Sequence, residues 1–152
     1  MSGAEIVVAA RDVAIVTAYA QGHSARHIAD ELGVSERAVY TRTQRLANRL
    51  GIVGAQKPAL VDYLYRHGYI AVGELRALPY LPPRKVEILR CAARGLGYRQ
   101  TAAELGIAAN TASNHRQALL ELLQVQSIAQ AVALAWEAGL LTEVCTTVRE
   151  GK

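Results

Sequence analysis

Histidines and cysteines are the residues of this chain that could bind a metal or take part in catalysis, and their spacing favours neither role. His23 and His27 stand four positions apart, but no carboxylate or cysteine is evident beside them as a ligand set. Gly95-x-Gly97 lies between two predicted helices instead of following a strand, so it is not a dinucleotide-binding fingerprint. We therefore expect no metal, no cofactor and no enzymatic activity.

Recognition of nucleic acid is the second chemistry that the residue types allow. A helix predicted at about residues 35–50 opens with Ser35 as its N-cap and carries an apolar stripe that includes Val39 and Leu46. The opposite face holds polar side chains that can donate hydrogen bonds: Arg37, Tyr40, Thr41, Gln44, Arg45 and Asn48. This face is therefore available to a partner outside the domain.

An internal repeat shows which elements must position that face. The pattern that runs from Gly22 to Val34 returns 73 positions later, from Gly95 to Ile107, and both copies contain Ala, Glu-Leu and Gly at the same places. Beyond the third helix the offset falls to 71, which places two extra residues in one loop of the first copy. The chain is thus predicted to hold two versions of one small unit.

Each copy is predicted to contain four helices, so the fold class is all-α. Glycines end the first two helices of each copy, and a segment with Gly73, Pro79 and Pro82 separates the copies. The predicted organisation is a first domain at 1–70, a connector at 71–80, and a second domain at 81–152 that includes a polar C-terminal tail. The third helix of the second copy is predicted at 109–123.

Composition and charge limit the classes of partner. The 152 residues carry a net charge of +4, which permits nucleic acid as a partner without showing it. The amino-terminal apolar stretch is too short for a secretory signal, and no window approaches the length of a membrane span. We expect a cytoplasmic protein that does not bind a membrane.

The order of these residues resembles the GerE/LuxR-type helix-turn-helix family. The second copy shows the resemblance best, with Leu81-Pro82-Pro83-Arg84, Ala102-Ala103-Glu104-Leu105-Gly106-Ile107, Asn110-Thr111 and His115-Arg116. The first copy retains Ile28-Ala29 and the run from Glu31 to Arg37. The resemblance implies a DNA-binding transcription regulator whose third helix enters the major groove and whose fourth helix can pair domains.

The resemblance also assigns roles to individual positions. Groove-facing residues are implied at Tyr40, Thr41 and Gln44 in the first copy and at Ser113, Asn114 and Gln117 in the second. Glutamine and asparagine can read adenine through two hydrogen bonds, and threonine can contact a thymine methyl group. The implied phosphate contacts are Arg37, Arg42, Arg45, Asn110, Thr111, His115 and Arg116.

The second copy departs from the family pattern. Ala108 and Ala109 replace the usual capping serine and a polar residue, and Gln124 stands where the first copy has Gly51. Its recognition helix carries a single arginine, against four in the first copy. We therefore hypothesise that the first copy supplies most of the electrostatic binding.

Two alternatives remain open at the level of the sequence. The fourth helices could pair through Val61, Tyr65, Val132 and Trp136, either within one chain or in a homodimer, although Trp136 could also simply complete a local core. The chain could instead be an adaptor that binds RNA polymerase or another regulator through one or both units.

Overall fold

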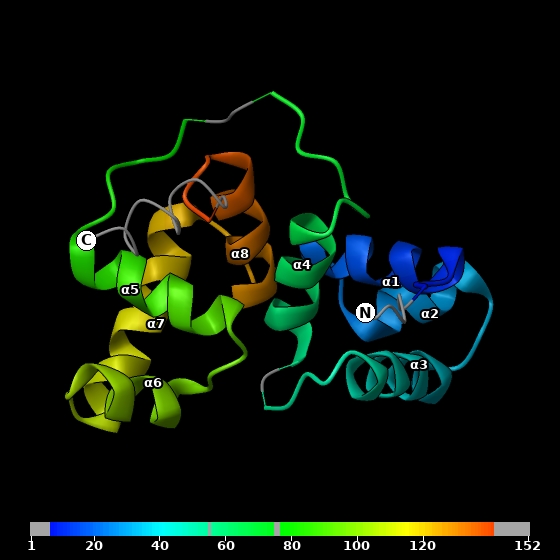
Figure 1. Ribbon diagram of the computed structural model, residues 1–152, viewed down its shortest axis with the longest axis horizontal. Coiled ribbons are helices and arrows are strands. Elements are labelled where there is room, and N and C mark those ends of the chain that lie inside the picture. The colour runs from blue at the N-terminus through cyan, green and yellow to red at the C-terminus, as the bar shows by residue number, and fades with distance from the viewer. Residues whose placement is uncertain (1–6, 55, 75–76, 142–152) are drawn as a thin grey trace, which may run out of the picture.

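The fold consists of two units of four α-helices each. The computed structural model describes residues 7–54, 56–74 and 77–141 (Figure 1). The first unit contains α1 (Ala10–Ala20), α2 (Ala25–Leu32), α3 (Glu36–Arg49) and α4 (Gln56–Arg66). The second contains α5 (Pro83–Ala93), α6 (Tyr98–Leu105), α7 (Ala109–Leu123) and α8 (Ile128–Glu137). The prediction of an all-α fold with two tandem four-helix units is confirmed.

Local capping residues explain where these helices begin and end. The Ser24 and Ser35 hydroxyls accept hydrogen bonds from the backbone of the first turns of α2 and α3. Pro83 is the first residue of α5, where its missing N–H costs no helical hydrogen bond. The two extra residues of the first unit lie between α3 and α4, because six residues separate these helices and four separate α7 from α8.

The apolar core runs through both units. Figure 1 shows α4 and α8 side by side in the middle of the molecule, with α3 towards one end of the long axis and α6 towards the other. Val61 and Leu64 of α4 and Val132 and Ala135 of α8 are fully buried, and α1 also packs on α8. One apolar cluster includes buried residues of α1, α3, α4 and α8, and Leu105 of α6 packs against it, so the two units share a core.

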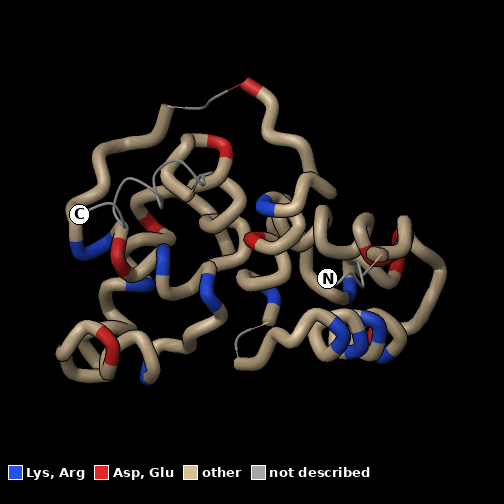
Figure 2. The backbone as a smooth tube through the Cα atoms, in the orientation of Figure 1, with Lys and Arg blue, Asp and Glu red and all other residues tan. Residues whose placement is uncertain are grey.

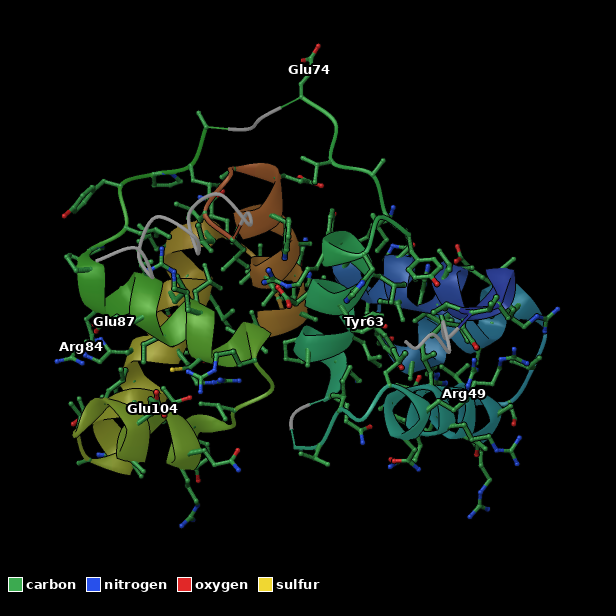
Figure 3. The ribbon with its side chains drawn as sticks, viewed as in Figure 1. Arg49, Tyr63, Glu74, Arg84, Glu87 and Glu104 are labelled. Atoms are coloured by element: carbon green, nitrogen blue, oxygen red, sulfur yellow. The ribbon has the colours of Figure 1, made fainter. Side chains whose placement is uncertain are left out.

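The connector between α4 and α5 crosses one edge of the molecule, with Glu74 projecting outwards (Figure 3). The predicted polar tail from Thr142 to Lys152 lies outside the described residues. Among the described helices, no single one is long and apolar enough to cross a membrane, while α7 and α8 meet that test as a pair bent by 57°.

Candidate nucleic-acid interface

Helices α2 and α3 form a helix-turn-helix in the first unit. Gly33 ends α2 with φ of +69°, a left-handed conformation that glycine adopts without steric penalty. Ser35 then starts α3, and its Oγ accepts a hydrogen bond from the Ala38 N–H at 3.0 Å. The turn is short and well capped, so the direction of α3 is fixed relative to α2.

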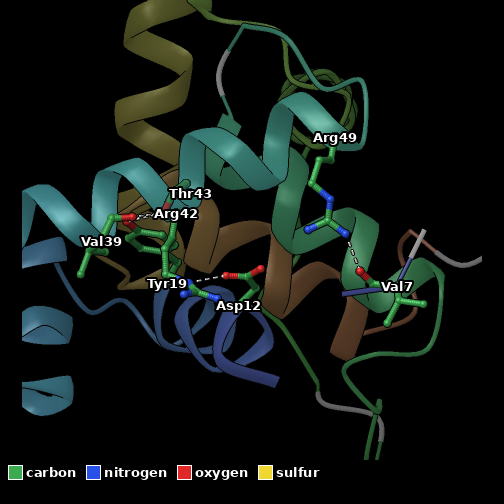
Figure 4. A network of polar contacts seen from close by, with 7 residues as sticks. All are labelled: Val7, Asp12, Tyr19, Val39, Arg42, Thr43 and Arg49. Atoms are coloured by element: carbon green, nitrogen blue, oxygen red, sulfur yellow. Dashed lines mark hydrogen bonds and ion pairs between the residues drawn. The ribbon is translucent and has the colours of Figure 1, made fainter. Parts of the chain in front are cut away.

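The inner face of α3 is tied to the start of the chain by polar contacts (Figure 4). Arg42 Nε donates to Asp12 Oδ1 at 2.9 Å, and an Arg49 amino group donates to the Val7 carbonyl at 2.6 Å. The Thr43 hydroxyl donates to the Val39 carbonyl, so Tyr19 is the donor in the 3.4 Å contact between the two hydroxyls. Burial raises the pKa of Tyr19, which keeps this phenol protonated as a donor.

The outer face of α3 presents the predicted recognition residues to solvent. Five of the six predicted residues of this helix are exposed and line one open depression together with Glu36: Arg37, Tyr40, Thr41, Gln44 and Arg45. The sixth, Arg42, is turned towards Asp12 of α1. The Gln44 amide also donates to Asn48 Oδ1 at 3.4 Å across one helical turn. These five side chains therefore lie on the solvent-exposed face of α3, and their contact with DNA stays a prediction.

Arg42 differs from the other predicted phosphate contacts. Its ion pair with Asp12, whose side chain is buried, means that its charge is already used to hold α3 against α1. This pairing spans 30 positions and could not be read from local sequence. The structure thus gives Arg42 a positioning role, with a guanidinium that is still partly exposed.

Two cations beside α3 were missed by sequence reasoning. Arg11 lines a depression with Arg37 and Arg45, and the Lys57 ammonium lies 5.8 Å from the centroid of the Tyr40 ring. Lys57 occupies the first turn of α4, where the helix dipole disfavours a cation. A lysine in the first turn of a helix is the sequence signal that could have indicated an anionic partner at this position.

Helices α6 and α7 form the corresponding helix-turn-helix of the second unit, with weaker capping. Gly106 ends α6 in the left-handed conformation, as Gly33 ends α2. Ala108 offers no side-chain cap to α7, in agreement with the departure noted in the sequence. Gln124 ends α7 with φ of +58° and is the sole non-glycine residue of the described chain with positive φ.

The predicted residues of the second unit are less uniformly exposed than those of the first. Asn110, Thr111, Asn114 and Gln117 are exposed, and the side chain of Ser113 is half-buried. These polar groups still give α7 an outer face able to form hydrogen bonds.

Arg116 and His115, the two predicted phosphate contacts of α7 that can carry a positive charge, are less exposed than Asn110 and Thr111. Arg116 is half-buried, with one amino nitrogen shielded from solvent and without a partner among the described residues, and this burial lowers its pKa. The structure therefore does not place Arg116 as an outward phosphate contact. His115 Nδ1 lies 3.0 Å from Lys85 Nζ, and burial together with the charges of Lys85 and Arg84 lowers the His115 pKa.

Charge differs between the two interfaces. Lys and Arg gather on α3 and are sparse on α6 and α7 (Figure 2). In the second unit Arg84 pairs with Glu87 at 3.1 Å (Figure 3), and Arg94 pairs with Glu104 at 3.3 Å. Within the described residues Arg37 and Arg45 of α3 form no ion pair, so their charges are available to an anion.

The predicted fourth-helix contact is formed inside the chain. The rings of Tyr65 and Trp136 stack with centroids 5.8 Å apart, and Trp136 Nε1 donates to Asp62 Oδ1 at 2.8 Å. Val61 and Val132 are fully buried in the same contact region. These four predicted residues therefore join the two units of one chain.

The expectation that no carboxylate accompanies His23 and His27 is wrong. Glu31 lies one helical turn beyond His27, and its Oε2 is 3.3 Å from His27 Nε2. One potential ligand atom from each of the three residues lies within 4.8 Å of the others. The spacing of His27 and Glu31, four positions apart on a helix, was the signal that could have revealed this.

In both halves, then, a short glycine turn joins two helices and the second helix presents a polar outer face, which defines the helix-turn-helix class. Residues 79–135 match the family model described as bacterial regulatory proteins, luxR family, and residues 10–56 match the model of a homeodomain-like domain. No curated protein and no solved structure matches the chain. The matches identify helix-turn-helix DNA-binding domains and indicate a DNA-binding transcription regulator.

Proposed function

We propose that the chain is a sequence-specific DNA-binding regulator, not an enzyme, that uses both helix-turn-helix units on one duplex in the cytoplasm. The observation that carries this proposal is the exposed face of α3, where Arg37 and Arg45 are unpaired within the described residues and flank Tyr40, Thr41 and Gln44. Such a face combines cations for phosphates with amide and hydroxyl groups for base edges.

The shared core supports a geometric part of the proposal. Because α4 and α8 pack together between α3 and the α6–α7 pair, one chain can take the place of the symmetric dimer that reads two half-sites (Figure 1). Half-sites read by paired helix-turn-helix units are about one DNA turn apart, roughly 34–36 Å. We propose that both units are of the LuxR type and that their half-sites have this spacing.

The adaptor hypothesis is favoured by one feature, the internal pairing of cations in the second unit. A mobility-shift assay on random-sequence duplex at low and moderate salt separates the two functions. A DNA reader shifts the duplex and loses affinity with added salt. An adaptor leaves the duplex unshifted until RNA polymerase or another regulator is added.

Two variants show whether the shift depends on α3, one altered on α3 and the other altered away from it. The double variant Arg37→Ala/Arg45→Ala should lose most of the shift, whereas Arg90→Ala should retain it, because Arg90 lines a cavity with Asp62 and Arg66 at the junction of the units. Equal loss in both variants would show that binding does not depend on α3. Selection of bound sequences from a random pool would then give the half-sites and their spacing.

A further inference from the structure

We propose that His23, His27 and Glu31 form a binding site for a divalent transition-metal ion of the zinc class, at the turn that leads into α2. This site is independent of the proposed DNA contacts, since none of its residues belongs to α3 or α7. It would give the first unit a ligand other than DNA.

The distances suit a small cation. His27 Nε2 and Glu31 Oε2 are 3.3 Å apart, and one ligand atom from each of the three residues lies within 4.8 Å of the others. Ligand atoms about 2.1 Å from a tetrahedral zinc ion stand about 3.4 Å from one another. The His27–Glu31 distance already fits, and rotation of side chains closes the remaining difference.

The backbone that carries the three ligands is held by hydrogen bonds. The His23 N–H donates to the Ala18 carbonyl at 3.0 Å, which ties the residue to the end of α1. The His27 N–H donates to the Ser24 hydroxyl at 3.1 Å, which fixes the first turn of α2. An ion therefore meets a largely formed site, and little chain entropy is lost on binding.

The histidine rings are placed together as well. Their centroids are 4.4 Å apart at an interplanar angle of 65°. His23 is half-buried, with Nδ1 shielded from solvent and without a hydrogen-bond partner among the described residues, so packing sets the orientation of its ring. His27 and Glu31 are exposed at 52% and 57%, which leaves an entry path for the ion.

The donor set defines the class of ion. Imidazole ligands suit zinc, copper and nickel, whereas magnesium and calcium prefer sites made of oxygen ligands alone. Two imidazoles and one carboxylate leave a fourth position of a tetrahedral ion to water. The rival interpretation is an ordinary surface ion pair between His27 and Glu31, which needs no contribution from His23.

The site lies where the two units meet. Gly22, directly before His23, has φ of +90°, and a side chain there would clash with Gln130 of α8. The turn that carries His23 is thus packed against the first turn of α8 in the second unit, while His27 and Glu31 lie on α2. An ion bound here would stabilise the contact between the first unit and α8.

Titration of the full chain with Co²⁺ and Zn²⁺, after removal of metal by a chelator, tests the proposal. Visible absorption of Co²⁺ reports coordination by imidazole and carboxylate, and competition with a chromophoric chelator gives the zinc affinity. We expect one ion per chain. The variants His27→Ala and Glu31→Gln alter exposed residues, and circular dichroism checks that each remains folded.

The matched controls are His67→Ala and Glu121→Gln, an exposed histidine and an exposed glutamate away from the site. Loss of a ligand should weaken zinc binding by at least the roughly 10–100-fold that loss of an outer-shell partner costs, and the controls should leave the affinity unchanged. The proposal is overturned if the chain binds no zinc, or if His27→Ala and Glu31→Gln bind it as tightly as the controls do.

Discussion

Replacing Trp136 by phenylalanine removes a buried hydrogen bond between the two units. The indole N–H of Trp136 on α8 donates to Asp62 Oδ1 on α4 at 2.8 Å, and both side chains are buried. The smaller ring retains an aromatic surface that can still stack on Tyr65. The substitution therefore tests the hydrogen bond with little change in packing.

The expected cost follows from the structure. A hydrogen bond to a charged acceptor contributes about 1.5–3 kcal/mol, and a gap about the size of a methyl group adds about 1 kcal/mol. Asp62 keeps its contacts with Arg66, at 3.3 Å from Nε and 3.1 Å from an amino nitrogen, so the carboxylate is not left alone. We expect Trp136→Phe to lower the free energy of unfolding by about 2.5–4 kcal/mol.

Urea denaturation followed by circular dichroism measures this loss, and calorimetry should show one transition with Tm lowered by about 5–16 °C. The variant Asp62→Ala completes a double-mutant cycle, for which we expect a coupling energy of about 1.5–3 kcal/mol. Tyr98→Phe is the matched control, since Tyr98 is exposed on α6 and its loss of a hydroxyl should cost less than about 0.5 kcal/mol.

A loss below about 0.5 kcal/mol for Trp136→Phe, or additive effects in the cycle, would show that the bond from Trp136 to Asp62 does not stabilise the junction of the units. Two separate unfolding transitions, with the substitution shifting only one of them, would show that the units do not share a cooperative core.

Two further predictions concern the second unit. Gln124→Gly should raise the free energy of unfolding by about 0.5–1 kcal/mol, because relief of roughly 1–2 kcal/mol of left-handed strain exceeds the entropic cost of glycine. A lower free energy of unfolding in urea denaturation would contradict this. The lowered pKa of His115 means that the unfolded chain takes up a proton that the folded chain resists. Stability should therefore fall as pH drops below about 6.5 towards the lowered folded value, and His115→Gln should reduce that fall in Tm; an identical pH profile would disprove the assignment.

The sequence predicted those features of the fold that short segments determine. Gly33 and Gly106 end their helices because glycine adopts the left-handed conformation, and Pro83 starts α5 because its missing N–H costs no helical hydrogen bond. Both effects involve only a few neighbouring residues. The outward face of α3 followed from helical periodicity in the same way. The pairing of α4 with α8 was one of several alternatives that the apolar faces allowed, and the structure selected the intramolecular one.

Features that depend on distant residues could not be predicted. Arg42 appeared equivalent to Arg37 and Arg45 until the fold brought Asp12, 30 positions away, against it. Arg116 has a helical position compatible with exposure, yet packing of the second unit half-buries its guanidinium. Glu31 is different, because its position four residues after His27 on a predicted helix was already visible in the sequence.

We expect α3 to supply most of the electrostatic attraction for DNA. The salt dependence of binding to one duplex, compared between two double variants of the full chain, measures this contribution. Arg37→Ala/Arg45→Ala should reduce the log–log slope by about 1.8, since each lost phosphate contact removes roughly 0.9. Lys85→Ala/Arg99→Ala removes two cations of the second unit, Lys85 in contact with His115 of α7 and Arg99 exposed on α6. This variant should reduce the slope by no more than about 0.9, and equal reductions in the two double variants would contradict a dominant role of α3.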